Sequence, residues 1–86
     1  MAKTTPWYVY VLLCADKTLY CGITTDLERR VEEHNHPKKA AKYTRARQPV
    51  RLVYSEEAKT RSLALIREWE IKQLSKAQKL SLIDKR

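Results

Sequence analysis

The sequence predicts an α+β fold in which a small three-stranded antiparallel sheet is flanked by helices. Three observations predict it. Two short runs rich in β-forming residues flank a polar turn near the start, a third such run lies in mid-chain, and helix-capping patterns precede the remaining apolar segments. The expected order is strand, strand, helix, basic loop or short helix, strand, helix, helix. With 86 residues, the chain is expected to form one domain over residues 1–86.

The first two strands are predicted to form a hairpin. Residues Trp7 to Cys14 are apolar and rich in Tyr, Val and Leu, which suits a buried strand. Leu19 to Thr24 has the same character, and the polar turn Ala15-Asp16-Lys17-Thr18 separates the two runs. Tyr10 and Tyr20 are then expected to approach each other across neighbouring strands.

A helix is predicted to follow the hairpin. Thr25-Asp26-Leu27-Glu28 has the capping-box pattern, so the helix is expected to start there and to run to about Asn35. Leu27 and Val31 are four residues apart and are expected to face the core.

One more strand and two more helices are predicted in the second half of the chain. Val50 to Ser55 alternates in the manner of a strand. Thr60 or Ser62 is expected to cap a helix that runs to about Leu74, and the capping box Ser75-Lys76-Ala77-Gln78 starts a last helix that ends near Asp84.

The composition points to a polyanionic partner. Eighteen Lys and Arg against ten Asp and Glu give a net charge of +8 and a pI near 9.7, which predicts nucleic acid; a basic surface that only solvates the protein is the alternative. No run resembles a signal peptide or approaches the ~20 apolar residues of a membrane span. We therefore expect a cytoplasmic protein with no membrane partner. Cys14 and Cys21 are expected to be reduced, with a cross-strand disulfide as the less favoured alternative, and no zinc-finger spacing is present.

Gly22 is the only glycine of the chain. Such a glycine is expected where the backbone needs φ > 0 or where another group approaches it closely. Tyr10, Tyr20 and Arg30 follow one another at intervals of ten residues, and His34 lies four residues, or about one helical turn, after Arg30. Each alone has an ordinary explanation in packing, solvation or the helix dipole. Together they predict a functional site, and a nuclease site is the leading interpretation.

The segment from Pro37 to Arg47 concentrates five cations around one aromatic ring. Cations in this pattern follow a phosphate backbone while the ring stacks on a base, although lysines and arginines of loops are commonly only solvated. The predicted nucleic-acid-binding residues of this segment are Lys38, Lys39, Lys42, Tyr43, Arg45 and Arg47.

These features together resemble the GIY-YIG nuclease superfamily, and the size of the chain resembles its small stand-alone bacterial members. Tyr8-Val9-Tyr10 matches the first motif and Tyr20-Cys21-Gly22 the second. The resemblance extends over about residues 7–83, which it implies to be the core of the domain. It implies catalytic roles for Tyr10, Tyr20, Arg30, His34 and Glu68, and it implies that Gly22 takes part in nucleic-acid binding.

The resemblance also implies a catalytic Mg²⁺ or Mn²⁺ held by Glu68. One carboxylate suffices, because Mg²⁺ fills its other positions with waters and substrate oxygens. Glu70 lies on a similarly apolar part of the helical wheel, so periodicity leaves both glutamates open. Many members of the superfamily carry an asparagine after the metal-binding glutamate. The only asparagine here is Asn35, so that position is vacant or its role is filled by Gln73 or a water.

The other residues of the predicted site have expected roles in phosphodiester hydrolysis. Arg30, which is always charged and reaches two phosphate oxygens at once, is expected to hold the transition state. A tyrosine whose pKa is lowered by nearby cations is expected to accept a proton from the attacking water. Tyr10 is the preferred base, with Tyr20 positioning the water or the phosphate, and the reverse assignment stays open. His34 is expected to relay a proton or to bind phosphate.

The function predicted from these residues is that of a metal-dependent endonuclease. Its expected substrate is DNA rather than RNA, single-stranded or structured and cut with low sequence specificity, and DNA repair is the expected process. The alternative is a nucleic-acid-binding module whose nuclease activity is weak or depends on a protein partner for targeting. The oligomeric state stays open.

Overall fold

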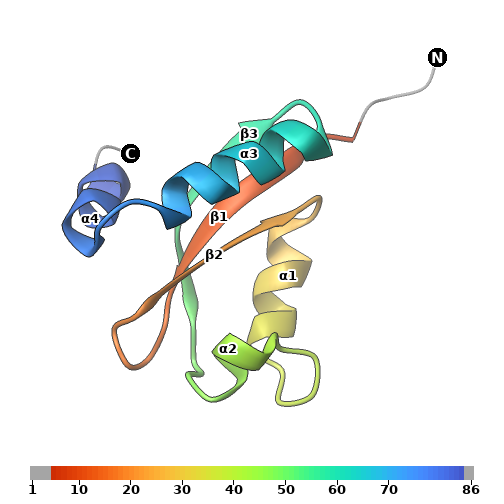
Figure 1. Ribbon diagram of the computed structural model, residues 1–86. Helices are drawn as coiled ribbons and strands as arrows, with labels where there is room; N and C mark the ends of the chain where they lie inside the picture. Colours follow the sequence, from red (N-terminus) through yellow and green to blue (C-terminus); the bar gives the residue numbers. More distant parts are fainter. Residues whose placement is uncertain (1–4, 85–86) are drawn as a thin grey trace.

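The computed structural model describes residues 5–84, and within this range the chain forms the predicted α+β fold with a three-stranded sheet (Figure 1). The elements follow one another in the predicted order. They are β1 (Trp7–Leu13), β2 (Leu19–Thr24), α1 (Leu27–His34), α2 (Lys42–Arg45), β3 (Arg51–Ala58), α3 (Arg61–Lys72) and α4 (Lys76–Asp84).

The sheet is antiparallel with strand order β2-β1-β3, so β1 is central and β2 is an edge strand. The hairpin register pairs Tyr10 directly with Gly22, and it pairs Leu12 with Tyr20. Because side chains alternate along a strand, Tyr10 and Tyr20 emerge on the same face of the sheet. The predicted approach of the two tyrosines is therefore confirmed.

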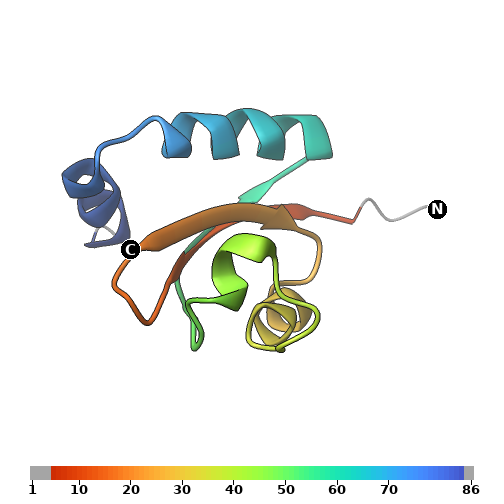
Figure 2. The ribbon, with the colours of Figure 1, turned by 60° about the horizontal axis from the view of Figure 1, so that its bottom comes forward.

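Helices cover both faces of the sheet. Figure 2 shows α3 on one side of the strands and α1 with α2 on the other, while α4 stands beyond the C-terminal end of α3. The alternation of β1 divides the core accordingly. Val9 and Val11 pack with Ala64 and Ile71 of α3, whereas Tyr10 and Leu12 belong to the cluster on the α1 side.

Several element boundaries differ from the predicted ones. The N-cap of α1 is Asp26, whose carboxylate accepts a hydrogen bond from the Arg29 amide at 3.1 Å, so the helix begins one residue later than the capping box at Thr25 predicts. β3 runs on to Ala58 because it pairs along the whole length of β1. Thr60 caps α3, as one of the two predicted alternatives, and α3 ends at Lys72.

The predicted capping box of the last helix is confirmed. The Ser75 amide donates to Gln78 Oε1 at 2.9 Å, and the Gln78 amide donates to Ser75 Oγ at 3.2 Å. The expectation for the thiols also holds, because Cys14 and Cys21 are both free and buried. They belong to the core clusters on opposite faces of the sheet. In the described part of the chain, no helix has the length and apolar character needed to cross a membrane.

Candidate active site

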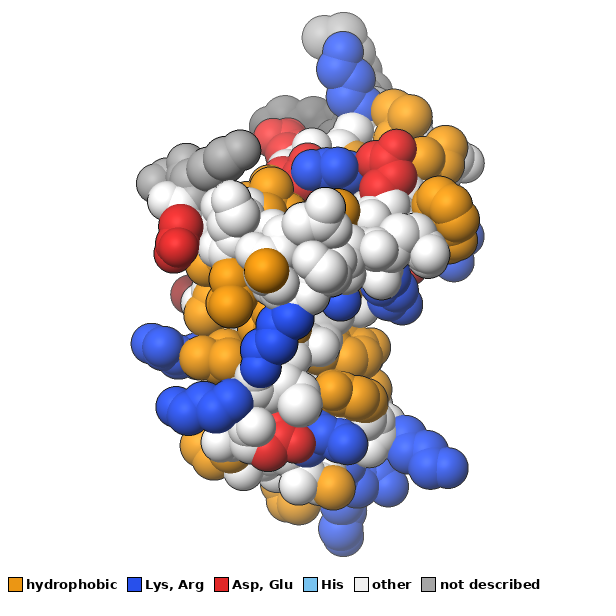
Figure 3. All heavy atoms as spheres, turned by 60° about the vertical axis from the view of Figure 1, so that its left-hand side comes forward, with side chains coloured by type: hydrophobic (Ala, Val, Ile, Leu, Met, Phe, Trp, Pro, Cys, Tyr) orange, Lys and Arg blue, Asp and Glu red, His pale blue; other side chains and the backbone are white. Residues whose placement is uncertain are grey.

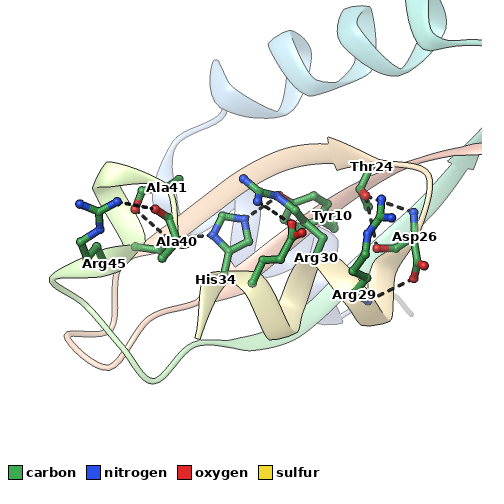
Figure 4. Close-up of polar contacts among 11 residues, drawn as sticks. Tyr10, Thr24, Asp26, Arg29, Arg30, His34, Ala40, Ala41 and Arg45 are labelled. Carbon is green, nitrogen blue, oxygen red and sulfur yellow. Dashed lines mark hydrogen bonds and ion pairs between the residues drawn. The ribbon is translucent and has the colours of Figure 1, made fainter. Parts of the chain in front are cut away.

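Four side chains predicted for the site meet between β1, β2 and α1. Tyr10 Oη lies 2.8 Å from His34 Nε2, and both residues are buried. The Tyr20 ring lies 5.0 Å from the His34 ring and 6.4 Å from the Tyr10 ring, measured between centroids. Arg30 lies close enough for its positive charge to act on the Tyr10 phenol, and it forms an ion pair of 2.9 Å with Glu33. Figure 4 shows Arg30 and His34 reaching from α1 towards Tyr10.

Gly22 supplies the space that the Tyr10 side chain occupies. A Cβ on Gly22 would lie 2.5 Å from Tyr10 Oη and 2.7 Å from Cζ, far inside van der Waals contact. Of the two reasons for a glycine named above, close approach is therefore the one that applies, and the φ of Gly22 is not positive. The glycine is buried. Its observed part in the site is to admit Tyr10, and its part in nucleic-acid binding stays a prediction.

His34 is anchored at both ring nitrogens. Besides Tyr10 at Nε2, Thr44 Oγ1 of α2 lies 2.7 Å from His34 Nδ1, and neither His34 nor Thr44 is exposed to solvent. Burial, followed by the positive charge of Arg30, lowers the pKa of His34 to about 4 against the opposing effect of Glu33. The imidazole is therefore neutral at physiological pH and can accept a proton.

The expectation of a tyrosine with a lowered pKa is wrong for Tyr10. Burial raises the pKa of Tyr10 to about 12, and the hydrogen bond from Arg30 only partly offsets this effect. Tyr10 is a phenol at neutral pH. As a base it must release its own proton while it takes up another one.

Tyr20 lies where the cluster opens to solvent. Its ring is half-buried and packs against Tyr43 of α2 at 5.7 Å, and the Arg47 guanidinium lies 4.0 Å above the Tyr43 ring. Tyr20 and Tyr43 also line a pocket of about 250 Å³ at the edge strand β2. The far wall of this pocket includes Lys72 of α3 and Lys79 of α4, two cations that the sequence did not single out. Figure 3 shows Lys and Arg side chains around the narrow middle of this side of the molecule.

The basic segment divides into anchored and exposed cations. Arg47 is tied to the protein by hydrogen bonds to Asp16 Oδ2 at 2.9 Å and to the Tyr43 carbonyl at 2.8 Å. Arg45 donates to the Ala40 carbonyl at 3.3 Å, as Figure 4 shows. Lys38, Lys39 and Lys42 lie on the surface. These three lysines are thus the cations of the segment best placed for a phosphate backbone.

Glu68 lies apart from the tyrosine cluster. It belongs to α3, which covers the face of the sheet opposite the tyrosines. Its side chain is 18% exposed and lies 3.6 Å from Lys72 Nζ. Burial and then the charge of Glu68 raise the pKa of Cys21 to about 11, so the carboxylate acts on the edge strand beside Tyr20. Glu70, by contrast, is 51% exposed and paired with Arg67 at 3.3 Å.

Metal binding would therefore rest on a single carboxylate. Among residues 5–84, no group of three or more His, Cys, Asp and Glu side chains is arranged to hold a metal ion. A largely buried glutamate with one long ion pair nevertheless fits Mg²⁺, which takes a single protein carboxylate and completes its shell with water and substrate.

Thr44 is the member of the cluster that the sequence did not reveal. It lies within the basic segment, where it looked like an unremarkable polar residue between Lys42 and Arg45. Its contact with His34 depends on how residues 35–50 fold back over α1. Two pairs of contacts fix that path. The Asn35 amide bonds the backbone of Val50 at 2.7 and 2.9 Å, and Gln48 Nε2 donates to the carbonyls of His34 and His36 at 2.8 and 3.0 Å.

Comparison with known proteins identifies the family. The family model described as the GIY-YIG catalytic domain matches residues 6–81, and the chain belongs to this family of nucleases. It is 54% identical over 77 residues to the UPF0213 protein DP2720 of Desulfotalea psychrophila, covering 90% of this chain and 70% of the relative. It is 49% identical over 79 residues to the UPF0213 protein SH2523 of Staphylococcus haemolyticus, covering 92% and 95% of the two chains.

A solved structure bears out the fold. The solution NMR structure of the UPF0213 protein BH0048 from Bacillus halodurans is similar with a TM-score of 0.61 and 41% sequence identity. The similarity covers 94% of this chain and 85% of that one.

Proposed function

We propose that this protein is a metal-dependent endonuclease that hydrolyses phosphodiester bonds in DNA, single-stranded or structured, with low sequence specificity. The observation that carries the proposal is the buried hydrogen bond of 2.8 Å between Tyr10 and His34, beside the positive charge of Arg30. A purely structural core would gain little from burying this polar cluster, because each buried polar group must find a partner.

Arg30 is proposed to bind the scissile phosphate. Its side chain is 28% exposed, and its guanidinium is held in place by Glu33. A guanidinium donates to two phosphate oxygens at once, and in the transition state it stabilises the extra charge on them.

Tyr10 and His34 are proposed to move the proton. Tyr10 takes a proton from the attacking water while its own proton passes to His34 Nε2, so no free phenolate is required. The phosphate helps this transfer, because it offsets the positive charge of Arg30 that lowers the pKa of His34. Tyr20, which is half-buried at the pocket, is proposed to position the water or the phosphate.

Glu68 is proposed as the only protein ligand of a Mg²⁺ or Mn²⁺ ion. When bound, such an ion polarises the phosphate and stabilises the leaving oxygen. Because Glu68 and Tyr20 lie on either side of the edge strand β2, the substrate is proposed to lie across this edge.

The cations around the site are proposed to guide the nucleic acid. Lys38, Lys39 and Lys42 would contact the backbone on the α2 side, while Lys72 and Lys79 line the pocket on the other. Phosphate contacts of this kind carry no sequence information, which supports low specificity. A cytoplasmic location and a part in DNA repair complete the proposal.

One observation favours a second candidate, a nucleic-acid-binding module with weak or partner-dependent cleavage. The Glu68 carboxylate has its ion pair with Lys72 and lies on the face opposite the tyrosines. A protein partner that brings the substrate across β2 would then be needed for targeting and for full activity.

The decisive experiment assays cleavage of single-stranded, duplex and branched DNA and of matched RNA, each with Mg²⁺, Mn²⁺ or EDTA. Glu68→Gln and Glu70→Gln are compared across a Mg²⁺ titration. We expect metal-dependent cleavage of DNA. Glu68→Gln should lose this cleavage, because an amide is a poor Mg²⁺ ligand, whereas Glu70→Gln should retain it. Binding without cleavage under every condition would favour the second candidate, and loss in Glu70→Gln alone would move the metal to Glu70.

A further inference from the structure

The buried histidine of the site raises the question of which nitrogen carries its proton. Neutral imidazole has one N–H donor and one bare nitrogen acceptor. His34 has a hydroxyl at each nitrogen: Tyr10 Oη at 2.8 Å from Nε2 and Thr44 Oγ1 at 2.7 Å from Nδ1. The other bonds of these two hydroxyls settle the direction of each contact.

The single proton of the Thr44 hydroxyl takes part in a hydrogen bond to the backbone. Thr44 Oγ1 donates to the carbonyl of Ala41, one turn earlier in the chain, at 3.2 Å. Towards His34 it therefore acts as an acceptor, which requires the proton of the imidazole to be on Nδ1.

The surroundings of the Tyr10 hydroxyl also favour a bare Nε2 on His34. The Arg30 guanidinium, whose positive charge acts on this phenol, is only a donor and cannot accept the Tyr10 proton. The Tyr10 proton is then free to be donated to His34 Nε2. The Thr44 hydroxyl, the imidazole and the Tyr10 hydroxyl then each donate one hydrogen bond, and no buried side-chain nitrogen or oxygen of the described residues lacks a partner.

We propose that Thr44 is a positioning residue of the active site, which fixes His34 as the Nδ1–H tautomer and so keeps Nε2 bare to receive the proton of Tyr10. Thr44 touches no reacting atom and acts only through His34. Because α2 carries Thr44, this short helix serves the chemistry of the site as well as the basic surface.

The consequence for catalysis rests on the proposed function. As water attacks phosphorus, its O–H bond breaks and the proton goes to Tyr10 Oη, while the Tyr10 proton goes to His34 Nε2. The hydroxide forms the new P–O bond, and the P–O bond to the leaving oxygen breaks. The leaving oxygen keeps the electron pair of that bond and takes a proton from solvent water, while His34 becomes an imidazolium with its Nδ1–H still bonded to Thr44. With the opposite tautomer, Nε2 already carries a proton and the transfer has no acceptor.

The tautomer is tested by NMR without any cleavage assay. In uniformly ¹⁵N-labelled protein at mildly alkaline pH, long-range ¹H–¹⁵N spectra distinguish the protonated from the bare ring nitrogen. The chain supplies its own reference, because His36 Nδ1 accepts from the Lys38 amide at 3.0 Å and should therefore be the Nε2–H tautomer. We expect opposite tautomers for the two histidines. An Nε2–H signature for His34 in the wild-type protein would overturn the proposal.

Two variants link the tautomer to turnover. Thr44→Val keeps the shape and removes the hydroxyl, whereas Thr44→Ser keeps the hydroxyl and removes a methyl group. We expect Thr44→Val to shift His34 towards Nε2–H and to lower kcat by about 10²-fold with little change in KM, the scale of a lost acid–base step. Thr44→Ser should retain the tautomer and most of kcat.

The outcomes separate this proposal from the proposed function. Suppose that the wild-type protein cleaves no substrate but shows Nδ1–H at His34, and that Thr44→Val changes this tautomer whereas Thr44→Ser does not. The nuclease proposal then fails, while the assignment of Thr44 stands. If the protein cleaves and a folded Thr44→Val, checked by its thermal melt, keeps both tautomer and kcat, the proposal for Thr44 is overturned and the nuclease stands.

Discussion

Replacing Gly22 by alanine tests how the hairpin builds the site. The change adds one methyl group to a buried position directly opposite Tyr10 in the strand register. The new Cβ would lie 2.5 Å from Tyr10 Oη and 2.7 Å from Cζ, whereas ordinary contact begins near 3.4 Å. The ring must therefore move by roughly 1 Å, a scale that core overpacking forces on its neighbours.

The ring has no free direction in which to move. Tyr10 is 1% exposed, and its hydroxyl is already 2.8 Å from His34 on the side away from the sheet. Overpacking of this kind costs about 1–3 kcal/mol. For a domain of this size that corresponds to a fall in Tm of roughly 4–8 °C per kcal/mol. The Tyr10–His34 contact should be lost with it, and cleavage should fall even in the fraction that folds.

The assay is urea unfolding of Gly22→Ala in two backgrounds, wild type and Tyr10→Leu. Leucine lacks the three side-chain atoms that the Cβ would meet, which are the hydroxyl Oη and the ring carbons Cζ and Cε2. Without the clash, alanine in a strand should be more stable than glycine by roughly 0.5–1 kcal/mol. The effect of Gly22→Ala should thus change sign between the backgrounds, a coupling that the double-mutant cycle measures. An equal cost in both backgrounds would refute the packing argument.

Three further predictions concern the charges of the site. Arg30→Ala should lower turnover by ~10²-fold, the scale of a lost transition-state contact, whereas Arg29→Ala, at an exposed neighbouring position, should not. Equal cleavage by the two variants would show that Arg30 does not bind the scissile phosphate. Replacing Lys38, Lys39 and Lys42 by Ala should flatten the dependence of the logarithm of the nucleic-acid binding constant on the logarithm of the salt concentration, because fewer counterions are released. An unchanged slope would show that these lysines are only solvated and do not contact phosphates. Because the pKa of His34 is lowered from 6.5 to about 4 beside Arg30, Glu33, Tyr10 and Thr44, the unfolded chain binds the proton first as pH falls. The free energy of unfolding should therefore decrease between pH 6.5 and 4, by at most about 3 kcal/mol, and a His34→Gln variant with the same pH profile would contradict this origin.

Local patterns sufficed for the existence of the three strands, for the caps of α3 and α4, and for the cluster on the α1 side. The single glycine marked the point where another group approaches the backbone closely or where φ is positive. The alternation of side chains along the strands placed Tyr10 and Tyr20 on one face. The spacing of Arg30 and His34 put both on the same side of α1. These features depend on neighbours within a hairpin or within a helical turn, so a short stretch of sequence contains them.

The parts that failed depend on contacts between distant segments. The apolar residues of α3 nearly surround the helix: Ala64 and Ile71 are buried, while Ile66 and Trp69 are 56% and 65% exposed. The pattern alone could not tell which side meets the sheet, nor which sheet face α3 covers. The lowered pKa expected for Tyr10 failed for a related reason, since the sequence showed the nearby cation but not the depth of burial that outweighs it.

The position of Glu68 follows from the same packing and decides how a substrate must lie. The tyrosines lie on one face and Glu68 on a helix of the other. The strand β2 connects the two sets, because burial and then the charge of Glu68 raise the pKa of Cys21, and the neighbouring Tyr20 lines the pocket. β2 can serve as this meeting place because it is an edge strand, with no fourth strand beside it in the described sheet. A scissile phosphate that is to reach Arg30, Tyr20 and a metal on Glu68 together must therefore lie against this edge, and the order β2-β1-β3 is what leaves it open.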